Sequence, residues 1–317
     1  MITRRSFTVP LHRRSVLAGL AGSVLVAAQG RAQQVASPRP AIPLTLRARP
    51  VRRPLRPGGP DSEIWALEPE TGGQLAFHRG DTVALTFQND LPVPAILNWY
   101  GLDGVPTAEP LLAGVPIAPA SRGMLTLPLL HAGTLLCDAR LLGDGQARAT
   151  GMLALKVGED GMTADHDEVL LIEDWRLRAD GSTAAPGMPA EGAAPIYTIN
   201  GQPSRDIPLR PNERVRFRFI NACQRNVVAV KIENHDVRVM AIDGRPAEPF
   251  AARDGQLMLA PGTRIDAIID ATGAPGSSAQ ILLHDGSSTL PIARLTTSGE
   301  PVRKTPIPPP SALPSDG

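Results

Sequence analysis

The sequence has few aromatic residues and no long stretch with the repeat of an amphipathic helix. Phe, Trp and Tyr together make up 3% of its 317 residues, so a core drawn from 42% hydrophobic residues must be mostly aliphatic. The formal net charge of +1 argues against a nucleic-acid partner and against electrostatic binding to membrane surfaces. Because 33 prolines and 30 glycines separate short apolar runs, the sequence predicts an all-β protein with many turns.

Residues that bind metals or act as nucleophiles are sparse and scattered. The sequence has six histidines and no His-x-His pair. Cys223, His235 and Met240 follow one another in the order of a blue-copper loop, but the first interval is too long for one. Glu173 and Asp174 are expected to be ordinary solvated carboxylates. Serine-nucleophile, paired-carboxylate and phosphate-loop patterns lack support, so the sequence gives no argument for hydrolysis.

The N-terminus has the features of an export signal. Arg13-Arg14 precedes an apolar run from Val16 to Ala28, and the small residues up to Ala32 suit cleavage. The run is shorter than the roughly 20 residues that span a bilayer, although an uncut membrane anchor is the alternative. We therefore expect residues 1–32 to be a twin-arginine signal peptide, and the mature protein to be periplasmic without a membrane span.

Short strand-like runs fill the remainder of the chain in two groups. The proline-rich segment before them is expected to lie extended over the first group, with Leu44, Leu46 and Ala48 forming an edge strand. The expected divisions are an extended arm, a first domain, a second domain and a proline-rich tail, at residues 33–60, 61–158, 165–297 and 298–317.

Two stretches of the first domain carry a recognisable motif in which four residues differ. One is Asn98-Trp99-Tyr100-Gly101, and the other is Gly133 to Leu141, about thirty residues later. The pair resembles the N-terminal domain of multicopper oxidases, where the first stretch reads His-Trp-His-Gly and the second ends in His-Ser-His. Those four histidines bind the trinuclear copper cluster of the family. The corresponding positions of this chain are Asn98, Tyr100, Asp138 and Arg140.

The second domain resembles the same family more closely. It contains an Ile199-Asn200-Gly201 turn and a strand from Arg214 to Ala222. The alternation of that strand predicts Val215, Phe217 and Phe219 on the core face and its arginines outside. The resemblance covers roughly residues 61–297 and implies two cupredoxin-like Greek-key β-sandwiches. The third cupredoxin domain of the family, which supplies the type 1 copper ligands, has no counterpart in the resemblance.

The four replaced residues predict that the site holds no copper cofactor. Asn and Tyr are poor copper ligands, and Arg140 is a permanent cation that would repel a metal ion. Asp138 and Arg140 alternate on one strand, and Asn98 and Tyr100 alternate on the other, so each pair shares a face. We expect the four side chains to converge in a polar network that replaces the cluster. The family includes a copper-free periplasmic cell-division protein, and this chain is similar to it in this loss of ligands.

Two further expectations concern partners and cysteines. Without a third domain, the face with Trp99 and Tyr100 is expected to be open and to bind a protein partner or a second copy. The alternative is that the arm or the tail folds back across it. Cys137 and Cys223 are expected either to form a disulfide between the domains or to remain buried free thiols. The second outcome applies if their strands are too far apart for the ~5.5 Å between Cα atoms that a disulfide needs.

The sequence thus favours an exported, copper-free multicopper-oxidase-like protein that acts as a binding or structural module in the periplasm. The alternative is a copper-binding oxidoreductase subunit whose remaining ligands come from another chain. It would need ligands at the four replaced positions, and the sequence offers none there. A copper carrier that uses methionines and Cys137 is a weaker idea, since the seven methionines are scattered.

Overall fold

The structure is a computed structural model that describes most of the chain from residue 40 onward. Within the described ranges, helix is limited to 3₁₀ turns at Pro106–Ala108 (η1) and Arg253–Gly255 (η2), and the predicted all-β class is confirmed. None of these turns approaches the length or hydrophobicity that a membrane crossing requires. The predicted signal peptide and residues 33–39 lie outside the described residues. These are 40–110, 112–143, 150–158, 164–178, 180–185, 193, 195–305 and 307–313.

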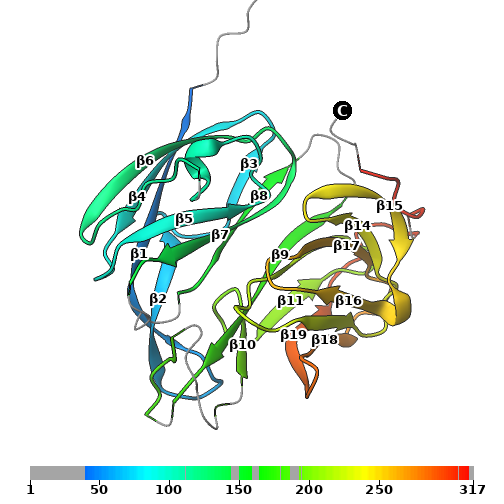
Figure 1. The fold of residues 1–317 in the computed structure, drawn as a ribbon. Coiled ribbons are helices and arrows are strands. Elements are labelled where there is room, and N and C mark those ends of the chain that lie inside the picture. Colours follow the sequence, from blue (N-terminus) through cyan, green and yellow to red (C-terminus); the bar gives the residue numbers. More distant parts are fainter. Residues whose placement is uncertain are drawn as a thin grey trace, which may run out of the picture. The chain divides into compact units, whose positions relative to one another are not determined.

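The first sandwich consists of two four-stranded sheets formed by β1 to β8 (Figure 1). One sheet has the order β2-β1-β4-β6, with the bounds Asp61–Pro69, Ile42–Pro54, Thr82–Asn89 and Ser121–Pro128. The other has the order β3-β8-β7-β5, with the bounds Leu75–His78, Leu153–Gly158, Gly133–Leu141 and Ala95–Tyr100.

Strand β1 lies inside its sheet, so the predicted edge position of this segment is wrong. Leu44, Leu46 and Ala48 are buried as their alternation predicts, but β1 pairs with β4 on one side and with β2 on the other. Proline is tolerated because the two pairings overlap only from Leu46 to Ala48. Pro43 and Pro50 each lie where β1 has a neighbour on one side only, and there a missing N–H need not break the ladder.

The second sandwich packs a six-stranded sheet on a five-stranded one (Figure 1). The six-stranded sheet has the order β10-β9-β12-β17-β14-β15, with the bounds Pro195–Ile199, His166–Arg176, Arg214–Asn221, Arg264–Asp270, Arg238–Ile242 and Arg245–Ala251. The five-stranded sheet has the order β11-β19-β18-β13-β16, with the bounds Arg205–Leu209, Thr289–Thr297, Ser278–His284, Val228–Ile232 and Gln256–Leu259.

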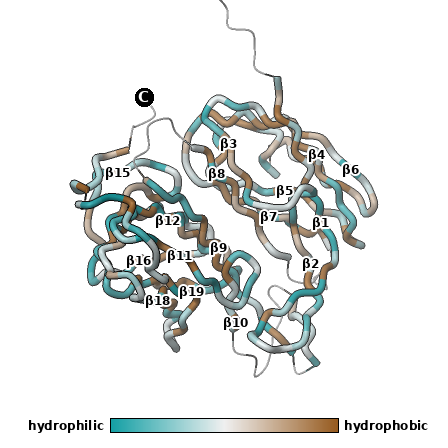
Figure 2. Tube along the Cα trace, turned by 180° about the vertical axis from the view of Figure 1, so that it is seen from behind, coloured by the Kyte–Doolittle hydropathy of each residue, from teal (hydrophilic) through white to brown (hydrophobic). Residues whose placement is uncertain are grey.

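Hydrophobic segments run along the strands of both sandwiches, and many connecting loops are hydrophilic (Figure 2). In β12 the predicted alternation is confirmed for the core face, because Val215, Phe217 and Phe219 are fully buried. The prediction that the arginines of β12 lie outside is wrong, since Arg216 and Arg218 are among the most deeply buried side chains. Their face of the sheet is covered by the first sandwich and is not open to water.

An apolar cluster joins the two sandwiches at that face. Leu136 of β7 packs with Val169 and Leu171 of β9 and with Ile220 of β12. Met152 of the first sandwich packs against the same cluster. Burial of this apolar surface holds the sheets together.

The described part of the proline-rich tail contacts the second sandwich. Arg303 lies 2.5 Å from Asp165, and Arg214 Nη2 donates a hydrogen bond to the carbonyl oxygen of Pro308 over 2.7 Å. These contacts involve the start of β9 and of β12, and not β5 or β7. For the described part of the tail, the alternative in which it covers the face of β5 and β7 therefore has no support.

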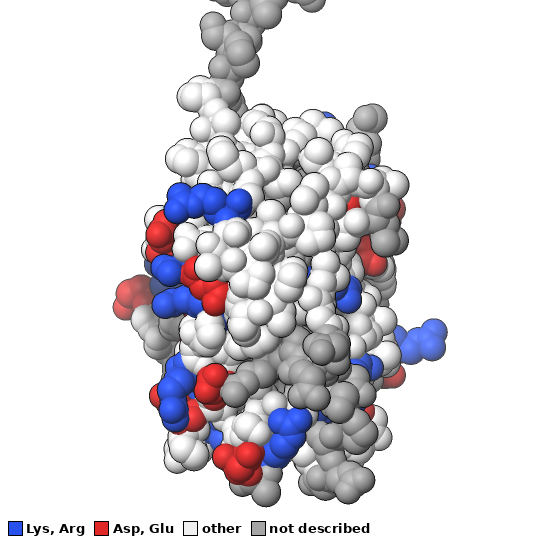
Figure 3. All heavy atoms as spheres, turned by 60° about the vertical axis from the view of Figure 1, so that its left-hand side comes forward, with Lys and Arg blue, Asp and Glu red and all other residues white. Residues whose placement is uncertain are grey.

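Acidic and basic side chains lie next to one another on the face of the molecule that Figure 3 shows, and an uncharged area separates them from further charges. Arg49 and Glu68 of the first sandwich form one of the ion pairs of the molecule, with 3.1 Å between Nη2 and Oε2. This face has no field of a single sign, in keeping with the formal net charge of +1.

Candidate functional site

The four residues at the replaced ligand positions come together on the face of β5 and β7 that points away from the core of the first sandwich. Asn98 and Asp138 are directly opposite one another in the antiparallel pair. Arg140 Nε lies 3.0 Å from Asp138 Oδ2, and Arg140 Nη2 donates a hydrogen bond to the Tyr100 hydroxyl over 2.6 Å. The predicted convergence is confirmed, and we call these four residues the polar quartet.

The carboxyl group of Asp138 lies in a poorly solvated environment. The residue is 6% exposed, and burial raises its pKa, although the Arg140 charge and the Asn98 and Tyr100 side chains oppose this shift. The pKa of Tyr100 is also raised, first by burial and then by the Asp138 charge. Asp138 Oδ1 has no hydrogen-bond partner in the described chain. Asp138 Oδ2 is thus ion-paired with Arg140, whereas Asp138 Oδ1 accepts no hydrogen bond from the described residues.

Trp99 lies in the core of the first sandwich and not on an open surface. It is 5% exposed and packs with the residues between the two sheets. The prediction that Trp99 forms part of a partner surface is therefore wrong, because neighbouring residues of a strand point to opposite faces. Since Asn98 and Tyr100 point outward, Trp99 must point inward. Tyr100 is half-buried against the apolar cluster between the sandwiches.

The two cysteines are free thiols in different cores, so the alternative of a disulfide between them is not what the structure has. Cys137 lies in the core of the first sandwich and Cys223 in that of the second. Burial raises the pKa of both thiols, and nearby carboxylates, Asp138 for Cys137 and Asp174 for Cys223, add to the effect. Both groups are therefore kept as neutral thiols, which are poor nucleophiles and poor metal ligands.

The polar quartet does not fit a copper cluster. The family's cluster needs imidazole nitrogens, and the quartet offers an amide, a phenol of raised pKa, and a carboxylate already paired with a guanidinium. A guanidinium cannot lose its proton to become a ligand. Within the described ranges, no group of three or more His, Cys, Asp and Glu side chains lies together as a metal site would require.

A cavity of about 400 Å³ adjoins the polar quartet, and we call it the quartet cavity. Tyr100, Asp138 and Arg140 line it from the first sandwich, and Cys223 and Gln224 line it from the second. A further polar residue of its wall is Thr150, which precedes β8. Neither Thr150 nor Gln224 could be predicted from the sequence as a cavity residue, because the cavity is formed by residues of both sandwiches together.

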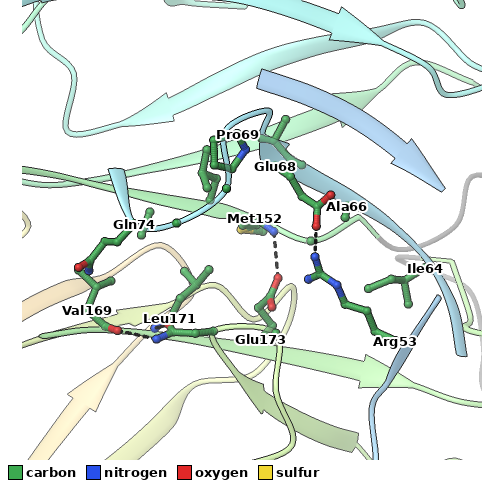
Figure 4. A pocket seen from close by; sticks show the side chains of 18 of the residues that line it. Arg53, Ile64, Ala66, Glu68, Pro69, Gln74, Met152, Val169, Leu171 and Glu173 are labelled. Carbon is green, nitrogen blue, oxygen red and sulfur yellow. Dashed lines mark hydrogen bonds and ion pairs between the residues drawn. The ribbon is translucent and has the colours of Figure 1, made fainter. Parts of the chain in front are cut away.

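A larger cavity of about 630 Å³ lies on the other side of Met152, which lines both. Figure 4 shows Glu173 pointing toward it, with the backbone N–H of Met152 donating to Glu173 Oε1 over 2.9 Å. The prediction that Glu173 and Asp174 are solvated is wrong, because they are 6% and 8% exposed. Burial raises the pKa of Glu173 to about 7, against the opposing effects of the Met152 N–H and the Arg53 charge.

Comparisons with known proteins show which family the chain is similar to. Residues 166–279 match the model of the multicopper oxidase family. The chain is similar to Laccase-6 of Oryza sativa subsp. japonica, with 28% identity over 232 residues that cover 65% of this chain and 39% of the relative. The chain thus spans about two fifths of the length of the curated relatives that it matches first.

Solved structures of the same kind have a similar fold. A multicopper oxidase from Pseudomonas Thermotolerans superimposes with a TM-score of 0.68 at 23% identity, covering 86% of this chain and 68% of that chain. Lac15 from a marine microbial metagenome gives 0.69 at 22% identity, covering 88% and 72%. The two sandwiches are therefore of the cupredoxin-like type. The match to the family model lies in the second sandwich, and the chain is similar to multicopper oxidases over both sandwiches.

Proposed function

We propose that this chain is an exported, copper-free member of this group of proteins and that it acts by binding. The observation that carries the proposal is the ion pair of Asp138 with Arg140, which the Tyr100 hydroxyl extends. A structural or binding role needs a stable, metal-independent arrangement at this place, and the quartet supplies one from its own charges.

The same contacts argue against binding of copper at these positions. A metal ion would have to separate Asp138 from Arg140 and would then lie beside an uncompensated guanidinium. Asn98 and Tyr100 offer neutral oxygen and nitrogen atoms that hold copper weakly. An oxidoreductase subunit that takes its remaining ligands from another chain would therefore begin with an unfavourable set on this side.

Binding of a partner remains part of the proposal, on a narrower surface than the sequence suggested. The Arg140 side chain is 56% exposed, and it is the member of the quartet that a second copy or another protein can reach most easily. Trp99 is excluded from this surface by its burial.

The test of the copper-free state is metal loading of the mature protein, residues 33–317. The protein is incubated with copper, freed of unbound metal, and analysed for metal content and visible absorption. We expect copper far below one equivalent, unchanged in an Asp138→Ala variant. Near-stoichiometric copper that disappears in the same variant would overturn the proposal and favour the oxidase subunit.

The test of export is separate and uses the full chain. Cells are fractionated after expression of the wild type and of a variant with Arg13→Lys and Arg14→Lys. Because the twin-arginine pair is the proposed export signal, the variant is expected to stay in the cytoplasm at its full length. A variant exported as efficiently as the wild type would contradict this route.

A further inference from the structure

Two residues that line the quartet cavity each have a buried polar atom without a hydrogen-bond partner in the described chain. Asp138 Oδ1 and Thr150 Oγ1 accept and donate no hydrogen bond within the described chain. Their residues are 6% and 9% exposed, so solvent does not reach these atoms freely. Buried polar atoms are almost always paired, because desolvation without a hydrogen bond is costly. Two such atoms on residues that line one cavity point to a molecule that binds there.

The larger cavity is different, because its charged groups are paired with one another. Figure 4 shows Arg53 directed toward Glu68, and these two form an ion pair. Arg205 lies 2.5 Å from Glu168 in the same wall. Glu173 accepts a hydrogen bond at each oxygen, from the Met152 N–H and, over 3.4 Å, from the Thr198 hydroxyl. The larger cavity therefore lacks the two unpaired oxygen atoms that distinguish the quartet cavity.

The charges of the quartet cavity define what would complement it. Asp138 and Arg140 give its wall one negative and one positive group, 3.0 Å apart. Asp138 has one oxygen to spare, and the guanidinium of Arg140 has five N–H donors, of which the described contacts use two. A ligand with a single charge would leave that charge uncompensated in a poorly solvated place. A ligand with one charge of each sign would find a partner for both charges, Asp138 for the positive one and Arg140 for the negative one.

We propose that the quartet cavity binds a small zwitterion of the α-amino acid type with an apolar side chain. Its ammonium group donates to Asp138 Oδ1, and its carboxylate accepts from Arg140 and from the Thr150 hydroxyl. The side chain packs against the apolar part of the wall, which contains Leu136, Leu141 and Met152. This assignment rests on the copper-free state proposed above, because bound copper would separate Asp138 from Arg140.

The test is calorimetric titration of the mature protein with L-leucine, alongside L-alanine and L-phenylalanine as smaller and larger probes. Saturable binding at one site is expected for at least one of the three. N-acetyl-L-leucine lacks the ammonium group and L-leucinamide lacks the carboxylate, so each is expected to bind at least about 10-fold more weakly than leucine, the loss that a missing charged hydrogen bond causes.

The matched variants act on the protein side of the same contacts. Asp138→Asn and Arg140→Gln are each expected to weaken binding by about 10-fold or more. Glu173→Gln lies in the other cavity and is expected to leave the affinity unchanged. Since a quartet variant could fail to fold, the two modified ligands test the same contacts on the unchanged protein.

Three results would overturn the assignment. They are the absence of binding for all three amino acids, equal binding of leucine and leucinamide, and equal affinity of the wild type and both quartet variants. The copper titration is read separately. No copper and no amino acid would refute the ligand alone, whereas stoichiometric copper lost in Asp138→Ala would refute the copper-free function as well.

Discussion

Arg218 of the second sandwich donates a hydrogen bond over 3.0 Å to the hydroxyl of Thr134 in the first, and both side chains are almost completely buried. The same guanidinium holds Asp167 with two hydrogen bonds, of 2.7 and 2.9 Å. Thr134 in turn donates to Asp266 over 3.1 Å. A buried arginine at the junction therefore ties the two sandwiches together through groups that would be costly to leave unpaired.

Replacement of Arg218 by alanine is expected to destabilise the protein by about 3–5 kcal/mol, because Asp167 loses both of its hydrogen bonds from the guanidinium and keeps only Lys156, at 3.8 Å. Asp266 keeps Arg216 as its counter-charge. Chemical denaturation of the variant and the wild type measures this change in the free energy of unfolding.

The control for this prediction is Arg294→Ala. Arg294 makes a bidentate pair of similar geometry with Asp206, at 3.0 and 2.8 Å, but the two side chains are 59% and 66% exposed. Its loss is expected to cost at most about 1 kcal/mol. Equal losses in the two variants would show that burial does not set the value of the Arg218 contacts.

A second prediction concerns Gly133, at the start of β7, where the two sandwiches approach closely. A Cβ atom at this position would lie 3.1 Å from the Cα of Gly244, and the φ angle of Gly133 is +141°. Gly133→Ala is therefore expected to destabilise the protein by about 1–3 kcal/mol through strain and overpacking. Thermal unfolding measures the loss. Gly244→Ala is the control, because its φ of +79° is also unfavourable but nothing lies near its Cβ. A larger loss in the control would refute the close approach as the cause.

The third prediction is a dependence of stability on pH that arises from Glu173. Burial raises the pKa of its carboxyl from 4.5 in the unfolded chain to about 7 in the folded protein. Between these values the folded state keeps a proton that the unfolded state has lost, so stability falls as the pH rises through this window. The loss amounts to about 3 kcal/mol and is complete above pH 7.

Glu173→Gln removes this ionisation and keeps the shape of the protonated carboxyl. The variant is expected to resemble the wild type near pH 4.5 and to exceed it in stability above pH 7, where the wild type must bury a charge. Denaturation curves at several pH values check this. Asp174 also has a raised pKa and keeps its own contribution in both proteins. Glu248→Gln, at an exposed position of β15, serves as the control and should change nothing.

The fourth prediction is that Cys137 and Cys223 do not react with a thiol reagent in the folded protein. They are 0% and 2% exposed and have raised pKa values, so neither access nor a thiolate is available. Unfolding without a reductant is expected to release two reactive thiols per chain. Met124→Cys provides a positive control, because this side chain is 79% exposed. Fewer than two thiols after unfolding would indicate a disulfide.

The alternation of side chains along single strands could be read from the sequence, and it gave the inner face of β12 and the convergence of Asp138 with Arg140. The same rule also places Trp99 in the core once Asn98 and Tyr100 are placed outside. Alternation does not predict what covers the second face of a sheet. The burial of Arg218 and Glu173, and the cavity with Thr150, depend on how two sandwiches dock, which no local pattern records.

The polar quartet and the core of the first sandwich occupy opposite faces of the same two strands. Leu97, Trp99, Cys137 and Ala139 hold the sheets together, while their neighbours on the other face meet each other without contributing to that core. The residues that form the polar quartet are therefore separate from those that form the core of the first sandwich. Protein engineers can use this chain as a host in which exchange of Asn98, Asp138 and Arg140 changes the site without touching the core of the first sandwich, whereas Tyr100 also packs against the cluster between the sandwiches.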